Sequence, residues 1–102
     1  MGELLMYVTK TISAANQWSN PLFLSEFYNY SAQLATGINV TVQRSFDKGM
    51  SWEDFETNAS PFSKVGFAPP TPPSESANPV MYRIGVKAGG AVASPVAVRL
   101  GV

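Results

Sequence analysis

The 102-residue chain contains no cysteine and no histidine. Without cysteine it has no disulfide, no thiolate metal site and no cysteine nucleophile. Without histidine it lacks the commonest general base and metal ligand, which excludes Ser-His-Asp catalysis and most zinc sites. We therefore expect a protein that is not an enzyme and that holds no metal and no cofactor.

The chain also lacks an excess of either charge and any long apolar run. Seven Lys and Arg residues balance seven Asp and Glu residues. No overall field would steer the protein to nucleic acid or to an anionic membrane. No segment approaches the ~20 apolar residues of a membrane span, and the N-terminus lacks the pattern of a signal peptide. We expect a protein made in the cytoplasm, with neither nucleic acid nor membrane as a partner.

What the sequence does contain is the two-residue period of β-strands. In "INVTVQRSF", every second residue from Ile38 to Phe46 is apolar except Arg44, and the residues between them are polar. No segment shows helical spacing with convincing caps. Similar segments, separated by turns rich in Gly, Asn and Pro, occupy residues 3–10, 22–35, 38–46, 80–87 and 96–102. The pattern predicts one domain over residues 1–102, an all-β antiparallel β-sandwich of immunoglobulin-like or jelly-roll type.

The stretch "SFDKGMSW", residues 45–52, matches the S-x-D-x-G-x-[ST]-W Asp-box found in the blades of sialidase propellers. A propeller needs several blades of about 40–50 residues each, and this chain carries a single box. The motif therefore predicts a β-hairpin turn and gives no indication of hydrolysis. Asp47 would accept backbone N–H groups, Gly49 would take a positive φ, Ser51 would bond back across the turn, and Trp52 would bury its ring in the core. Ser45 opens the motif.

Three carboxylates follow the turn, at Glu53, Asp54 and Glu56. Two of them would suffice to imitate a glycosidase pair or a calcium site. However, adjacent residues of a strand point to opposite faces, and the D-x-[DN]-x-[DN]-G pattern of a calcium loop is missing. The sequence favours a solvated polar edge.

Four aromatic residues cluster upstream, at Phe23, Phe27, Tyr28 and Tyr30. They could form a platform on which sugars stack. Their alternation with polar residues on an expected strand favours filling of the core instead.

Residues 61–79 hold six of the eight prolines of the chain. Proline cannot supply ladder hydrogen bonds and favours polyproline II geometry, so we expect a loop or an arm here, long enough to touch a neighbouring subunit. A mobile surface loop without a partner is the alternative. The P-x-x-P spacings lack the flanking arginine that would favour an SH3-type partner. The candidate partner contacts are Phe62, Val65, Phe67, Pro69, Pro70, Pro72 and Pro73.

Three stretches together point to a family. "VTVQRSFDKGMSWEDFE", followed by "YRIGVKAG" and "VAVRLGV", resembles small virion structural proteins of tailed bacteriophages. Their pattern combines Q-R-S-x-D-G-G-x-[ST]-W with Y-R-x-x-V and V-x-[VL]-R-L. The resemblance covers residues 38–102, and the chain departs from it in the expanded proline-rich segment.

The resemblance implies an auxiliary capsid protein that decorates or cements the head through protein–protein contacts. Its partners would be the major capsid protein or neighbouring virion subunits, with several copies of the chain on each particle. A tail fibre, adaptor or connector subunit is one alternative. A glycan-binding module for adsorption to the host, with Tyr28, Tyr30 or Trp18 as the stacking surface, is another.

Overall fold

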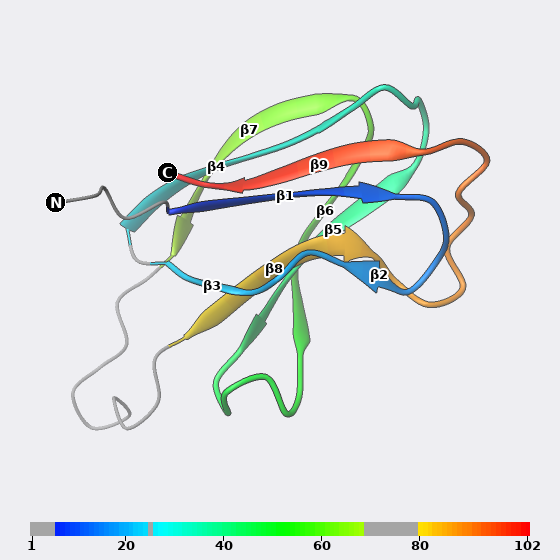
Figure 1. Ribbon diagram of the computed structural model, residues 1–102. Helices are drawn as coiled ribbons and strands as arrows, with labels where there is room; N and C mark the ends of the chain where they lie inside the picture. The colour runs from blue at the N-terminus through cyan, green and yellow to red at the C-terminus, as the bar shows by residue number, and fades with distance from the viewer. Residues whose placement is uncertain (1–5, 25, 69–79) are drawn as a thin grey trace, which may run out of the picture.

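The computed structural model describes residues 6–24, 26–68 and 80–102. It confirms the all-β prediction, because these residues form two antiparallel sheets packed as a sandwich (Figure 1). No helix that could cross a membrane occurs among them. The strands are β1 (Tyr7–Ile12), β2 (Gln17–Trp18), β3 (Leu22–Phe23), β4 (Glu26–Gln33), β5 (Asn39–Ser45), β6 (Glu53–Ala59), β7 (Phe62–Ala68), β8 (Met81–Val86) and β9 (Val96–Gly101).

The two sheets join strands that are far apart in the sequence. Sheet A has the order β1-β9-β4-β7, and sheet B has the order β2-β8-β5-β6 with β3 also paired to β8. The expected strand over residues 22–35 is divided between the sheets, since β3 belongs to sheet B and β4 to sheet A. In sheet A the edge strands are β1 and β7, and β6 is an edge of sheet B.

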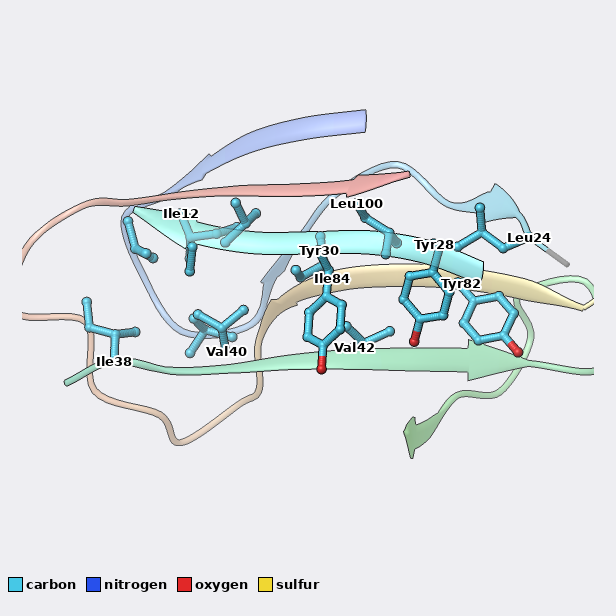
Figure 2. Close-up of a cluster of buried hydrophobic side chains, with 14 of the residues drawn as sticks. Ile12, Leu24, Tyr28, Tyr30, Ile38, Val40, Val42, Tyr82, Ile84 and Leu100 are labelled. Atoms are coloured by element: carbon cyan, nitrogen blue, oxygen red, sulfur yellow. The ribbon is translucent and has the colours of Figure 1, made fainter. Parts of the chain in front are cut away.

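The core lies between the sheets and follows the alternation of the strands. On β4, Tyr28, Tyr30 and Ala32 are buried while the residues between them face outward. Complete burial of a side chain of this size contributes about 1.5–3 kcal/mol, so the inward faces of the central strands supply most of the stability. The remaining core residues include Ile12, Leu24, Ile38, Val40, Val42, Tyr82, Ile84, Val86, Val96, Val98 and Leu100 (Figure 2).

Three tyrosines fill one part of this core. The ring centroids of Tyr28 lie 5.7 Å from Tyr30 and 5.8 Å from Tyr82, and the three hydroxyls point in the same direction (Figure 2). The Tyr30 hydroxyl donates to a carboxylate oxygen of Glu56 and accepts from Asn58 Nδ2 at 3.2 Å. Burial, followed by the hydrogen bond to Glu56, raises the pKa of Tyr30 to about 12. This polar link ties β4 of sheet A to β6 of sheet B.

The expectation of a loop or arm over residues 61–79 is wrong for residues 62–68. They form β7, and all seven residues pair with β4. The physical reason lies in the proline positions, because "FSKVGFA" contains none and fills the interval between Pro61 and Pro69. The rest of the expected arm, 69–79, lies outside the described residues, and with it the candidate contacts Pro69, Pro70, Pro72 and Pro73.

Candidate functional site: the outer face of sheet A

The Asp-box motif forms the turn between β5 and β6, which pair antiparallel. Ser45 Oγ donates to Asp47 Oδ1 at 2.7 Å and accepts the Gly49 N–H at 2.8 Å, while Asp47 accepts the Ser51 N–H at 2.9 Å. Lys48 and Gly49 reverse the chain with φ of 62° and 88°. Hydrogen bonds from Ser51 and Ser45 lower the pKa of Asp47 to about 2. The polar groups of the motif are therefore engaged within the turn.

The expectation that Trp52 buries its ring in the core is wrong. Trp52 is half-buried on the outer face of sheet B, where its Nε1–H donates to Gly49 O at 3.1 Å. The Arg83 guanidinium carbon lies 4.2 Å from the centroid of the Trp52 ring and 4.3 Å from that of Trp18. Arg83 Nε and Nη2 donate to Gln43 Oε1 at 3.0 and 2.8 Å. The Trp52 ring therefore lies on the sheet surface, where a cation–π contact with Arg83 stabilises it.

Little in the sequence predicts this stack. The one signal is the position of Arg83 on the polar face of an alternating strand, two residues before Gly85. Gly85 is required there because a Cβ would overlap Trp18 and the Gln17 carbonyl. Desolvation lowers the pKa of Arg83.

The three carboxylates after the turn do not converge. Glu53 forms an ion pair with Arg44 at 2.6 Å, and Asp54 forms one with Lys87 at 2.6 Å, which lowers the pKa of Asp54. Glu56 accepts from the core tyrosine described above. In the parts of the chain that the structure describes, no group of three acidic side chains could hold a metal ion.

The four upstream aromatic residues divide between core and surface. Tyr28 and Tyr30 are 1% and 2% exposed, so they fill the core as expected and cannot serve as a stacking surface for sugars. Phe23 and Phe27 are exposed, and the expectation that they fill the core is wrong. Trp18 already covers one face of the Arg83 cation.

Phe27 belongs to an exposed apolar cluster on the outer face of sheet A. Phe27 of β4 and Phe67 of β7 lie directly opposite each other, with edge-to-face rings 5.1 Å apart. Val65, two residues before Phe67, projects from the same face. The three residues are 68%, 45% and 66% exposed in the order Phe27, Phe67, Val65, and we call them the apolar end. Contiguous exposed apolar residues of this size mark interaction surfaces.

A shallow hollow occupies the same face beyond the apolar end. Its volume is about 540 Å³, and residues of β1, β4 and β9 line it, among them Thr9, Thr11, Ser31, Gln33 and Arg99. Hydroxyl, amide and guanidinium groups lie there among apolar atoms of the lining. The outer face of sheet A therefore combines an apolar contact area with adjacent hydrogen-bonding groups, as protein interfaces do.

Of the other predicted partner contacts, Phe62 lies on the inward side of β7. Its ring packs edge-to-face on Tyr30 at 5.5 Å, so it is a core contact and does not belong to the outer surface.

Comparison of the chain with protein-family models, curated proteins and solved structures finds no match. Functional inference therefore starts from the surface described above and from the motifs of the sequence.

Proposed function

We propose that the chain is an auxiliary structural protein of a tailed-bacteriophage virion, which decorates or cements the head through protein–protein contacts. The resemblance over residues 38–102 supports this role, and a small sandwich built of paired strands suits a subunit mounted in many copies. In this role the protein performs no chemistry and holds no cofactor.

The observation that carries the proposal is the apolar end. Phe27, Val65 and Phe67 form one contiguous exposed apolar area, and docking on a neighbouring subunit would remove that area from water. The hydroxyl and amide groups of the hollow then provide the polar rim of the contact. The partner is the major capsid protein or another virion subunit. The same surface would serve a tail fibre, adaptor or connector subunit, from which location alone distinguishes it.

The hollow favours a second candidate, a glycan-binding module for adsorption. Arg99 lines it with its guanidinium carbon 4.9 Å from the Tyr7 ring centroid, and the lining includes hydroxyl and amide groups. Titration of the purified protein with host polysaccharide, followed by NMR shifts of Ser31 and Gln33, tests this candidate. Shifts confined to the hollow support it, and an unchanged spectrum at millimolar sugar excludes it.

Immunogold electron microscopy of intact particles from an infected lysate tests the leading proposal. We expect gold spread over the shell. Gold at one vertex or along the tail would move the protein to the fibre and adaptor class. Unlabelled particles, with the antigen free in the lysate, would contradict both virion roles.

A pair of variants then assigns the surface. Phe27→Glu places a charge in the apolar end, while Leu34→Glu places the same charge on an isolated side chain that is 83% exposed. Both positions are exposed, so both variants should fold. We expect Phe27→Glu to weaken particle attachment at least about tenfold, the loss expected when a contact of about 1.4 kcal/mol is removed. Equal attachment of the two variants would place the contact elsewhere.

A further inference from the structure

The free edge of β7 leads to an inference about the partner of this surface. β7 is the last strand of sheet A and pairs with β4 on one side only. Among the described residues, no backbone hydrogen bond outside the sheet ladders involves residues 62–68. Within the part of the chain that the structure describes, the backbone donors and acceptors of β7 that point away from β4 have no partner, and such an edge is a template for another strand.

The other long edge on this side of the molecule is protected against such pairing. β6 carries Glu53, Asp54 and Glu56 within seven residues, so two β6 strands would bring acidic side chains together. β7 carries a single charge, Lys64, which shares the inward side with Gly66. The outward side of β7 carries Ser63, Val65 and Phe67.

We infer that β7 pairs antiparallel with β7 of a second copy of this chain, in the register that places Val65 opposite Val65 of the other copy. Only this register pairs all seven residues, because residue 65 is the middle of the strand. It sets Lys64 opposite Gly66 and Phe67 opposite Ser63, so no like charges meet and the lysine and the phenylalanine each face a small residue. A register centred on Lys64 would oppose two cations and is disfavoured.

In this register β7 is complementary to itself, so the partner that fits it is a second copy of the chain. A two-fold axis at Val65 joins the two A sheets into one sheet of eight strands whose outer faces lie on the same side. The two apolar ends then become neighbours around the Val65 pair. This inference deepens the proposed function and rests on it for the role of the surface, since the pair would present a doubled apolar end to the particle.

Single cysteines test the pairing without interference, because the chain has no cysteine of its own. Residues directly opposite each other have Cβ atoms about 4.5–5.5 Å apart, close to what a disulfide requires. Val65→Cys should therefore cross-link to itself under mild oxidation. Thr9→Cys is the matched control, as it is exposed on the same face but on the opposite edge strand. We expect Val65→Cys to cross-link about tenfold faster or more, because pairing holds the thiols at a high effective concentration.

Mixtures test the register. Ser63→Cys mixed with Phe67→Cys should give a heterodimer, whereas Ser63→Cys alone should not, since its two copies lie about 13 Å apart along the strand. A heterodimer formed instead from Val65→Cys and Phe67→Cys would overturn the register. Cross-linking of Val65→Cys no faster than that of Thr9→Cys, with wild-type protein monomeric in light scattering at high concentration, would overturn the pairing.

The pairing and the virion role can fail separately. A protein that does not cross-link but labels particles in immunogold microscopy overturns the pairing alone. A protein that cross-links at residue 65 but is absent from particles overturns the virion role alone.

Discussion

β6 and β7 are consecutive edge strands of equal length, but they differ in the charge and polarity of their side chains. β6 has three acidic residues, and its side chains bond to Arg44, Lys87 and Tyr30. β7 has one lysine and two large apolar side chains that face outward. A turn at Ser60 and Pro61 leads the chain from sheet B to sheet A between them.

The difference shows what an edge strand is suited for. Charges on an edge repel another strand, so β6 is built to remain an edge. An edge with few charges and an apolar face accepts contacts, so β7 is suited to a partner. Within 16 residues, from Glu53 to Ala68, the chain thus passes from an acidic edge that disfavours strand pairing to the edge that we propose as a binding surface.

The largest effect on stability is expected from a substitution that disrupts the packing of β7. A Cβ at Gly66 would overlap the ring and hydroxyl of Tyr28. Gly66→Ala should lower the free energy of unfolding by about 2–3 kcal/mol, the upper part of the range for overpacking. The matched control is Ser63→Ala on the exposed side of the same strand, which should stay within about 0.5 kcal/mol of wild type. Urea unfolding measures both, and an unaffected Gly66→Ala protein would show that β7 is not a part of the core.

A smaller effect tests the link from β6 to sheet A. Tyr30→Phe removes the hydroxyl that contacts Glu56 and Asn58, and it should cost about 1 kcal/mol at pH 7. The folded-state pKa of Tyr30 is raised from 10.0 to about 12, so its contribution is complete below pH 10 and is lost as the pH rises through 12. The stability difference between wild type and Tyr30→Phe should therefore shrink from pH 9 to pH 12 in urea unfolding. A constant difference would mean that folding does not raise the pKa of Tyr30.

The smallest effect concerns the turn that leads into β6. The pKa of Asp47 is lowered from 3.8 to about 2, so its hydrogen bonds stabilise the fold above pH 4 and lose their effect as the pH falls toward 2. Asp47→Asn should be slightly less stable than wild type at pH 6 and equally stable at pH 2. Thermal unfolding across this range measures the difference. If the difference in stability between the two proteins persists at low pH, the effect of the substitution does not come from the charge of Asp47.

The sequence predicted much of the fold because strand alternation is a local property. Residues 38–46, 80–87 and 96–102 showed the period clearly and correspond to β5, β8 and β9 within two residues at each end. The sequence does not predict β7, because prolines lie on both sides of it and its seven residues do not alternate between apolar and polar. The division of 22–35 between two sheets was not predictable, since sheet membership depends on contacts with strands at the other end of the chain.

The candidate surface was harder to predict than the fold. The sequence predicts Val65 and Phe67 as partner contacts, but as parts of an arm, and it predicts that Phe27 fills the core. Periodicity states which residues share a face of a strand, and it does not state which face lies inward. Here Tyr28 and Tyr30 take the inward face of β4, and Phe27 is placed outside because it is out of phase with them.

The pairing of β1 with β9 has a consequence for the synthesis of the protein. β9 lies between β1 and β4. Sheet A therefore lacks this central strand until residues 96–101 leave the ribosome. Until then β1 and β4 have no common neighbour, and the apolar residues of both sheets stay partly open to water. Folding must wait for the far end of the chain and then close a loop of more than 80 residues, which places this domain among the slower folders of its size. During that delay, chaperones and premature strand pairing would compete for the nascent chain.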